Sequence, residues 1–406
     1  MIRFFISLVS FGFLLLALDI ISYASTARIE NGTRLFVDGK PFFPIGIYYL
    51  PKSENPYAEL AEAGFNLVRS DLSEEQLNAA DAQGLKVWIS LGHRLDFSED
   101  SEKRKRDLET QVNQFKSHPA LLAWESIDEP AWTWKKPAEA RVSAENLAAG
   151  HEYLKKLDAN HLLWINHAPR NTCKTLQKFS AHTDAVACDI YPVIPRNIDA
   201  DKTYALMSNG KQGDLANQSL SCVGEYVHKM KKVADSKKAT WIVLQGFAWN
   251  HDTNPDNPLF PTPEETRFMA YDAVINGVEG ILYWGTHVMP QPSPQWDGIK
   301  RVAKELSALT PVLLAPTIQH NISIDYEEMG FSIDKGIEIL AKYHDNKVYL
   351  IMANTTIGPV KATFSQLLNI YTDTLNVLFE NRKVTITSGT FVDEFKPYGV
   401  HVYCTP

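Results

Sequence analysis

From Phe42 to Lys52 the sequence reads FFPIGIYYLPK. Its apolar part, Phe42–Tyr49, has the length and the composition of a buried β-strand. A doubly wound α/β sheet carries a glycine-rich phosphate loop directly after its first strand, and here Leu50, Pro51 and Lys52 occupy that place. The stretch therefore predicts the start of a parallel sheet that is not of the doubly wound, nucleotide-binding kind.

The alternation of short apolar runs with amphipathic stretches continues from Phe42 to about Leu309. The runs that predict strands are Phe42–Tyr49, Phe65–Arg69, Leu85–Leu91, Leu121–Ile127, Leu162–Asn166, Ala185–Tyr191, Trp241–Phe247 and Gly280–Trp284. Between them lie stretches with apolar residues three and four positions apart, for example Ser73–Gln83, Glu139–Leu157 and Glu264–Asn276, which predict helices. Eight strand and helix pairs in about 270 residues match a closed (β/α)8, or TIM, barrel in both count and size.

Different patterns flank the predicted barrel. Before it, the segment Arg28–Lys40 with the turn signal Asp38-Gly39 predicts a hairpin. After Pro311 the helical periodicity stops, and the runs that predict antiparallel strands are Ile337–Tyr343, Lys347–Ala353, Leu375–Phe379, Lys383–Ile386 and Gly399–Cys404. We therefore expect an α/β protein in which residues 25–310 form the barrel with its N-terminal hairpin. Residues 311–406 should form a small all-β, sandwich-like domain.

The first residues have the pattern of a secretory signal peptide. Arg3 precedes the apolar run Phe4–Leu18, and small residues around Ala24 follow. Asp19 interrupts the run before it reaches the roughly 20 residues of a membrane-spanning helix. We expect residues 1–24 to be removed and the protein to be secreted or periplasmic, with no membrane attachment after cleavage.

The charge and the motifs that are missing exclude several function classes. The formal net charge of -8 argues against nucleic acid and anionic membranes as partners. Neither a Cys-x-x-Cys pair nor a His-rich tract occurs, and the first strand carries Ile45-Gly46-Ile47 where a metal-dependent barrel hydrolase would need His-x-His. A Gly-x-Ser-x-Gly nucleophile motif is also missing. We expect no metal and no cofactor, and we expect Cys188, inside an apolar run, to be buried.

Polar and aromatic residues gather at the C-terminal ends of the eight predicted strands, where barrel enzymes keep their reactive groups. They are Tyr48, Tyr49, Arg69, Asp71, His93, Arg94, Asp128, Glu129, Asn166, His167, Asp189, Tyr191, Gln245, Trp249, Trp284, Thr286 and His287. Together they suit a neutral polyhydroxylated ligand, whose apolar faces stack on rings and whose hydroxyls need fixed partners. The composition of this barrel mouth therefore predicts a carbohydrate ligand.

The strongest signal for function is WESIDEP, Trp124–Pro130, which His118-Pro119-Ala120 precedes. It resembles the fourth-strand motif of the retaining glycoside hydrolases in the large barrel clan that holds cellulases, β-galactosidases and β-mannanases, where Asn-Glu-Pro closes the strand. The β-mannanase form, Trp-Glu-Leu-x-Asn-Glu-Pro, is especially similar. The resemblance implies that Glu129 is the general acid and base. It also implies that Asp128 replaces the family's amide, which binds the hydroxyl next to the anomeric carbon.

Asp128 and Glu129 are adjacent carboxyl groups, and two like charges at short range disfavour ionisation of both. This favours a protonated Glu129, as a general acid at neutral pH requires. The alternative is an acidic helix cap, because Asp and Glu often precede Pro at a helix start.

The resemblance extends to other strand ends. Arg69, Tyr191 and Trp284 match the clan's second-strand Arg, sixth-strand Tyr and eighth-strand aromatic floor. Each match has an alternative interpretation. Arg69 could form a buried ion pair with Glu125, and the aromatic rings could belong to the hydrophobic core. We further expect three more residues to bind the substrate, namely Tyr49, His93 and Asn166.

The seventh strand departs from the family pattern. The clan's nucleophile is a Glu at the end of this strand, and Gln245 stands at the matching place, where we expect it to bind the substrate. Because an amide cannot attack the anomeric carbon, three interpretations stay open. Asp189 or Asp128 activates a water in an inverting reaction, or an acetamido group of the substrate acts as the nucleophile, or the protein binds glycans without cleaving them.

The first hypothesis is thus a glycoside hydrolase that acts on a polysaccharide or oligosaccharide, and the alternative is a catalytically inactive carbohydrate-binding barrel. In the first hypothesis the candidate catalytic residues are Glu129, Asp128 and Asp189. A second carboxylate across the pocket from Glu129 would distinguish the two, because both stereochemical outcomes of hydrolysis need one within about 5 to 10 Å.

Overall fold

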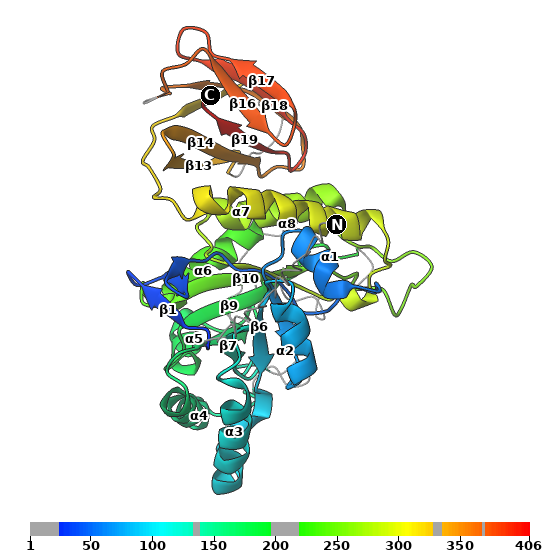
Figure 1. Cartoon of the computed structure of the whole chain (residues 1–406). Helices are drawn as coiled ribbons and strands as arrows, with labels where there is room; N and C mark the ends of the chain where they lie inside the picture. The colour runs from blue at the N-terminus through cyan, green and yellow to red at the C-terminus, as the bar shows by residue number, and fades with distance from the viewer. Residues whose placement is uncertain (1–23, 133–138, 196–218, 328–334, 368–369) are drawn as a thin grey trace, which may run out of the picture.

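The computed structural model of the chain describes residues 24–132, 139–195, 219–327, 335–367 and 370–406. Eight parallel strands close into a barrel in chain order, and the last of them pairs with the first (Figure 1). They are β4 (Ile45–Ile47), β5 (Leu67–Ser70), β6 (Lys86–Ser90), β7 (Leu121–Glu125), β8 (Leu162–His167), β9 (Ala185–Ile190), β10 (Ala239–Gln245) and β11 (Ile281–Trp284). The predicted barrel is confirmed, and every predicted strand overlaps an observed one. Apart from Ala24, the predicted signal peptide lies outside the described residues.

Helices follow the strands and cover the outside of the barrel. They are α1 (Pro56–Glu62), α2 (Glu74–Asp81), α3 (Ser101–Phe115), α4 (Ala144–Leu157), α5 (Cys173–Phe179), α6 (Cys222–Ala234), α7 (Pro263–Ile275) and α8 (Pro294–Leu313). Helix α4 does not begin at Glu139 as predicted. The Ser143 side chain accepts a hydrogen bond from the Asn146 N–H and so caps the first turn. Arg141, two residues before this cap, lies at the barrel mouth, where its N–H donates a hydrogen bond to the Pro130 carbonyl.

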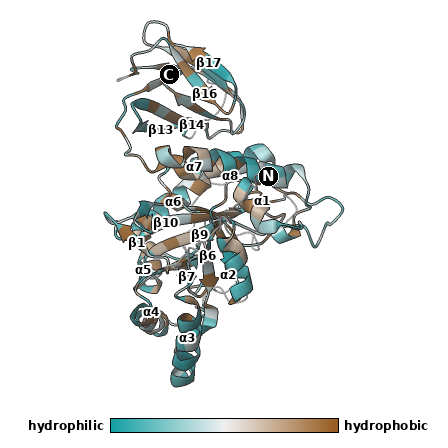
Figure 2. Cartoon of the chain, in the orientation of Figure 1, coloured by the Kyte–Doolittle hydropathy of each residue, from teal (hydrophilic) through white to brown (hydrophobic). Residues whose placement is uncertain are grey.

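The alternation of side chains along the strands sends large rings into the barrel and aliphatic groups toward the helices. Inside, the ring of Trp164 lies between those of Trp88 and Trp241, at centroid distances of 5.9 Å and 5.3 Å. Gly46 leaves room for this core, because a Cβ there would lie 2.2 Å from Leu282 Cδ2. Figure 2 shows mostly hydrophobic barrel strands and a mostly hydrophilic α3, as expected for a parallel sheet that is buried on both faces.

The N-terminal segment forms two successive hairpins instead of the single one predicted. It consists of β1 (Ala27–Glu30), β2 (Arg34–Val37) and β3 (Lys40–Pro41). All four residues of the turns Asn31-Gly32 and Asp38-Gly39 have positive φ angles, which is the backbone that tight hairpin turns require. The hairpins cover the N-terminal end of the barrel, because their buried side chains belong to the same hydrophobic cluster as the barrel interior.

After α8 the chain forms two antiparallel sheets. The first consists of β12 (Ser323–Tyr326), β15 (Val360–Ser365) and β18 (Phe391–Phe395), and the second of β13 (Ile337–His344), β14 (Lys347–Asn354), β19 (Val400–Cys404), β16 (Thr374–Leu378) and β17 (Arg382–Thr385). The two sheets share one core, in which Phe364 stacks on Phe391 at a ring centroid distance of 4.7 Å. The predicted all-β region is confirmed, while the three strands of the first sheet were not predicted.

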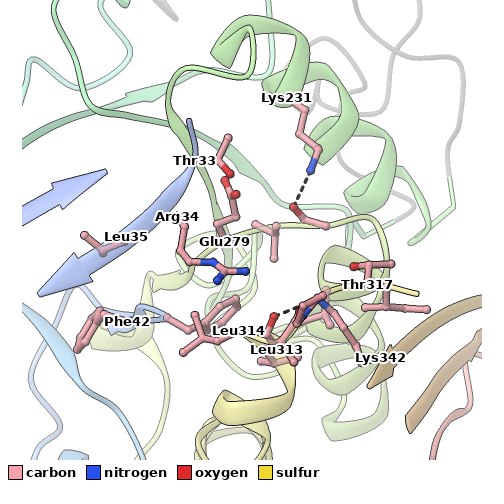
Figure 3. A pocket seen from close by; sticks show the side chains of 17 residues that line it. Thr33, Arg34, Leu35, Phe42, Lys231, Glu279, Leu313, Leu314, Thr317 and Lys342 are labelled. Atoms are coloured by element: carbon pink, nitrogen blue, oxygen red, sulfur yellow. Dashed lines mark hydrogen bonds between the residues drawn. The ribbon is translucent and has the colours of Figure 1, made fainter. Parts of the chain in front are cut away.

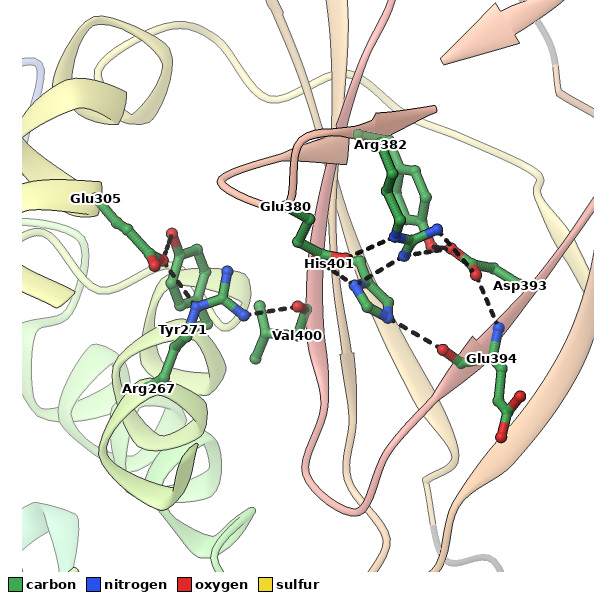
Figure 4. Close-up of polar contacts among 10 residues, drawn as sticks. Arg267, Tyr271, Glu305, Glu380, Arg382, Asp393, Glu394, Val400 and His401 are labelled. Atoms are coloured by element: carbon green, nitrogen blue, oxygen red, sulfur yellow. Dashed lines mark hydrogen bonds and ion pairs between the residues drawn. The ribbon is translucent and has the colours of Figure 1, made fainter. Parts of the chain in front are cut away.

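The larger of these sheets packs on helices α7 and α8 (Figure 1). In Figure 4, Arg267 of α7 pairs with Glu305 of α8 at 2.8 Å and donates to the Val400 carbonyl of β19 at 2.7 Å. A second polar group lies within the β-region and comprises Glu380, Arg382, Asp393 and His401. The carboxylates of Glu305, Glu380 and Asp393 thus have cationic or imidazole partners, and these contacts join neighbouring helices or strands.

A pocket of about 240 Å³ lies at the N-terminal end of the barrel, between the hairpins, the ends of α7 and α8, and the β-region (Figure 3). Lys231 donates to the Gly277 carbonyl at 3.0 Å and Lys342 donates to the Leu313 carbonyl at 3.1 Å. Both carbonyls lie at or just beyond the end of a helix, where a cation is favourable. By binding these carbonyls, the two lysines stabilise the junction between the barrel and the β-region.

The cysteines and the helices give two further results. All four cysteines are free, and Cys188 is buried as predicted. Among the described residues, no helix combines the length and the apolar composition of a membrane-spanning segment.

Candidate active site

The segment after β7 carries Asp128 and Glu129 into the barrel mouth. Glu129 has a φ of 46°, in the left-handed region that residues with a Cβ rarely adopt. Its N–H donates to the Asn166 carbonyl at 3.0 Å, and its own carbonyl accepts from the Trp132 N–H at 3.2 Å. Such backbone strain costs on the order of 1 kcal/mol and concentrates at functional sites.

The residues that follow Glu129 decide between the two interpretations of the Asp-Glu-Pro motif. Pro130 and Ala131 belong to a turn and not to a helix. Helix α4, the next helix of the described residues, has Ser143 as its own cap. Glu129 therefore does not act as an acidic helix cap.

A pocket of about 240 Å³ opens at the C-terminal ends of the strands, and it is lined by Tyr48, Asp128, Glu129, Asn166, Pro169, Asp189, Tyr191, Phe247, Trp249 and Trp284. Two sides of this pocket differ in chemistry. The carboxylate side consists of the residues from β7, β8 and the end of β9, namely Asp128, Glu129, Asn166 and Asp189. The aromatic side continues around the barrel and consists of Tyr191, Phe247, Trp249, Trp284 and Tyr48.

On the carboxylate side one amide links two acids. Asn166 Nδ2 donates to Asp128 Oδ1 at 2.9 Å and to Asp189 Oδ1 at 3.2 Å. The side chains of Asp189 and Glu129 are hydrogen-bonded to each other. Arg141 Nη2 lies 3.3 Å from Glu129 Oε2, and Glu129 is only 6% exposed. Three acidic groups, one amide and one guanidinium therefore form a single connected cluster.

The cluster holds protons near neutral pH. Burial raises the pKa of Asp189 from 3.8 to about 7, and the negative charge of Asp128 adds to the increase. Loss of solvation inside the barrel mouth also raises the pKa of Asp128, although part of its side chain is exposed in the pocket. A hydrogen bond between two carboxyl groups requires a proton on one of them. The contact between Glu129 and Asp189 is thus a place where one proton is available to the pocket.

Glu125 lies below the pocket, inside the barrel. It accepts hydrogen bonds from Tyr48 Oη at 3.0 Å and from Trp88 Nε1 at 3.2 Å, and burial raises its pKa to about 7. Arg69 instead pairs with the exposed Asp71, at 3.5 Å. Within the described residues, the alternative of an ion pair between Arg69 and Glu125 is therefore not realised.

Four rings of the aromatic side form one connected group, namely those of Tyr191, Phe247, Trp249 and Trp284. Tyr191 stacks on Trp284 at a centroid distance of 5.8 Å, and Phe247 packs edge-on against Tyr191 at 4.9 Å and against Trp284 at 5.1 Å. Trp249 Nε1 donates to the Tyr191 carbonyl at 3.1 Å. The Tyr191 hydroxyl has no hydrogen-bond partner among the described residues, and its pKa is raised well above the usual value by burial. It can therefore donate a proton in a hydrogen bond to a ligand.

Gln245 does not line the pocket. It is fully buried, and its Oε1 accepts from the Val193 N–H at 2.9 Å. Its Nε2 donates to the Val193 carbonyl at 2.9 Å and to the Phe247 carbonyl at 3.0 Å. The side-chain amide thus fastens the segment after β9 to the end of β10, and all of its hydrogen bonds are made within the protein.

The structure brings most, but not all, of the predicted site residues together. Those that line the pocket are Asp128, Glu129, Asn166, Asp189, Tyr191 and Trp284. Tyr49 lies beside it, with its ring 6.3 Å from that of Trp284. Arg69, His93 and Gln245 are not lining residues, and His93 is exposed on the 3-10 helix Gly92–Leu95.

Sequence reasoning did not single out three residues of the site, namely Pro169, Phe247 and Arg141. Phe247 ends a predicted strand, so its position at a strand end was a usable signal. Arg141 reaches Glu129 from the segment before α4 and has no comparable signal. Among the described residues, no group of three or more His, Cys, Asp or Glu side chains has an arrangement that could hold a metal ion.

No family model matches the sequence, and no curated protein matches it. Solved structures resemble it over most of the chain. A glycoside hydrolase family 5 protein from Bacteroides vulgatus ATCC 8482 has a TM-score of 0.55 at 13% identity, with 93% of this chain and 92% of that chain covered. An alpha-amylase from Geobacillus thermoleovorans has a TM-score of 0.54 at 10% identity, with coverages of 89% and 98%. At such identities the likeness establishes the fold alone: this chain shares its (β/α)8-barrel fold with solved glycoside hydrolases.

Proposed function

We propose that this protein is a glycoside hydrolase that cleaves O-glycosidic bonds of a polysaccharide or oligosaccharide, with Glu129 as general acid and base. The observation that carries the proposal is the placement of Glu129 in the pocket. Its backbone is held in a strained conformation, and its carboxyl contacts both Asp189 and Arg141. Strain that is maintained at a pocket-lining acid is typical of a reactive group.

The surroundings of Glu129 suit an acid that must be charged and uncharged in turn. A general acid donates its proton to the leaving oxygen and later takes one from the attacking water. Asp189 can accept or return a proton across its hydrogen bond, because its pKa of about 7 lies near neutral pH. Arg141 stabilises the negative charge that Glu129 carries after donation.

The aromatic side of the pocket supports a sugar as the substrate. Rings bind the apolar faces of a sugar, while the carboxylate side offers acceptors for hydroxyl groups. We therefore propose a carbohydrate as the partner of this pocket. Secretion or a periplasmic location remains a proposal that rests on the residue 1–24 pattern alone.

One observation favours a second candidate, a carbohydrate-binding protein without catalysis. The seventh barrel strand, β10, contributes no acid to the pocket, because Gln245 is bonded to Val193 and Phe247. Digestion of a panel of plant, algal and microbial glycans, with analysis of the products, separates the two candidates. A hydrolase releases new reducing ends, while a binding protein retards glycans on affinity electrophoresis and releases none.

Glu129→Gln is the variant that assigns the activity to this pocket. We expect it to reduce turnover of natural glycans by a factor of roughly 100 to 10,000. Glu109→Gln, on the exposed surface of α3, is the matched control and should leave turnover unchanged. If Glu129→Gln has the same free energy of unfolding as wild type and its turnover is unchanged, Glu129 is excluded as the acid.

A further inference from the structure

Hydrolysis of a glycosidic bond by two enzyme carboxyl groups needs them on opposite sides of the anomeric carbon. They are about 5 to 5.5 Å apart when the second is a nucleophile and about 6.5 to 9.5 Å apart when it activates a water. In this pocket the lining carboxyl groups come from β7 and β9 only, and the sector from β10 through β11 to β4 is aromatic. Hydrolysis therefore needs a group that attacks the anomeric carbon from the side opposite Glu129.

Asp189 and Asp128 are both on the wrong side for this task. Asp189 is hydrogen-bonded to Glu129, so the two carboxyl groups are in contact and leave no room for an anomeric carbon or a water between them. Asp128 shares the Asn166 amide nitrogen with Asp189, at 2.9 Å and 3.2 Å, and it therefore belongs to the same side. Neither acid faces Glu129 across the pocket.

The end of β10 does not supply the missing group either. The Gln245 amide is held by two hydrogen bonds to Val193 and one to Phe247, and it is fully buried. The other residues that β10 and β11 contribute to the pocket are Phe247, Trp249 and Trp284, none of which is a nucleophile in glycosyl transfer. Among the residues that the structure describes, the pocket lining thus offers an acid and hydrogen-bonding groups but no carboxylate that opposes Glu129.

We propose that the substrates are glycosides of 2-acetamido-2-deoxy sugars and that the substrate's acetamido oxygen is the nucleophile, an inference that rests on the proposed hydrolase function. Asp128 accepts the acetamido N–H, since its carboxylate has acceptor capacity beyond its bond to Asn166. The Tyr191 hydroxyl, without a partner in the described residues, donates to the acetamido carbonyl. The acetamido methyl group packs among Phe247, Trp249 and Trp284.

The reaction then proceeds in two balanced steps. The acetamido carbonyl oxygen forms a bond to C1 while the bond from C1 to the leaving oxygen breaks, and Glu129 transfers its proton to that oxygen. The product is a bicyclic oxazolinium ion, whose N–H faces the negative charge of Asp128. A water then gives its proton to the Glu129 carboxylate and attacks C1, which opens the ring and restores the acetamido group with retained configuration.

The test compares aryl glycosides that differ only at C2. The 2-acetamido-2-deoxy and the 2-hydroxy forms of the gluco, galacto and manno sugars are assayed in both anomers with the wild-type protein. We expect kcat/KM of at least one acetamido substrate to exceed that of its hydroxyl counterpart by more than a hundredfold. A sugar-fused thiazoline, the stable analogue of the intermediate, should inhibit at least a hundredfold more tightly than the free acetamido sugar.

The variants separate this inference from the proposed function. Asp128→Asn should reduce kcat by roughly 100 to 1,000 times and weaken thiazoline binding, while Asp107→Asn, exposed on α3, should change neither. Glu129-dependent cleavage of the hydroxyl substrates at equal rate would overturn the inference and leave the hydrolase function standing. Absence of turnover on every substrate, together with absence of activity on the glycan panel, would overturn both.

Discussion

Strands β7 and β10 end at the same edge of the barrel, three strands apart, but their ends are built differently. After β7, Glu129 keeps a strained backbone and presents an acid to titratable neighbours. At the end of β10, Gln245 is fully buried and makes three hydrogen bonds with backbone groups. The first arrangement costs stability and places a reactive group in the pocket wall, while the second adds stability and places none there. A residue that stands at a family's catalytic position therefore need not reach the pocket.

The largest effect on stability is expected at the β10 end. Gln245→Leu leaves the Val193 N–H and carbonyl buried without partners, so the free energy of unfolding should fall by about 2 to 4 kcal/mol, measured by urea denaturation. Gln177→Leu is the control, because it removes a single exposed hydrogen bond from the Gln177 side-chain amide to the Lys232 carbonyl. It should lower the free energy of unfolding by less than about 0.5 kcal/mol. Equal losses in the two variants would contradict a structural role for Gln245.

The second effect concerns pH and the β7 side. The folded pKa of Asp189, about 7, lies above its ordinary value of 3.8, so the folded state binds more protons and this group's contribution to stability falls as pH rises from about 4 to about 7. Asp189→Asn removes that contribution. The unfolding free energy of the variant relative to wild type should therefore increase across this window, with a slope of up to about 1.4 kcal/mol per pH unit. A difference that does not change with pH would show that Asp189 is not the proton holder.

The smallest effect is expected at Arg141. Its ion pair with Glu129 is partly exposed, so Arg141→Gln should lower the free energy of unfolding by at most about 1 kcal/mol. Lys155→Gln is the control, because Lys155 is about as exposed as Arg141 and pairs with Asp184 at 2.8 Å at the other end of the barrel. Both variants should lose similar stability, and only Arg141→Gln should lose turnover. Equal turnover in the two would separate Arg141 from the site.

The sequence was informative about the barrel for a physical reason. Its strands are buried on both faces, so each reads as a continuous apolar run, and the helices between them keep their own period. The strands β15 and β18 were missed because they belong to a small sheet and alternate buried with exposed residues over only five or six positions. The wrong start of α4 had a local cause, since the cap at Ser143 outweighed the apolar pattern.

The candidate site was predictable where strand ends alone determine it and unpredictable where loops do. Asp128, Asn166 and Asp189 follow or end their strands, and the barrel brings them together. The structural role of Gln245 depends on its hydrogen bonds to Val193, which is 52 residues away in sequence and outside any regular element. Arg141 likewise reaches Glu129 from a segment between elements. Contacts made by irregular segments leave no periodic pattern in the sequence.

The most direct test of the central claim, that Glu129 is the acid of this pocket, is the dependence of kcat/KM on the leaving group. Wild type and Glu129→Gln are compared on a series of aryl glycosides whose phenols span a wide range of acidity. We predict a loss of roughly 100 to 10,000 times for the poorest leaving groups that shrinks toward none for the best, because a good leaving group needs no proton. A loss of the same size for every leaving group, or no loss at all, would contradict the account.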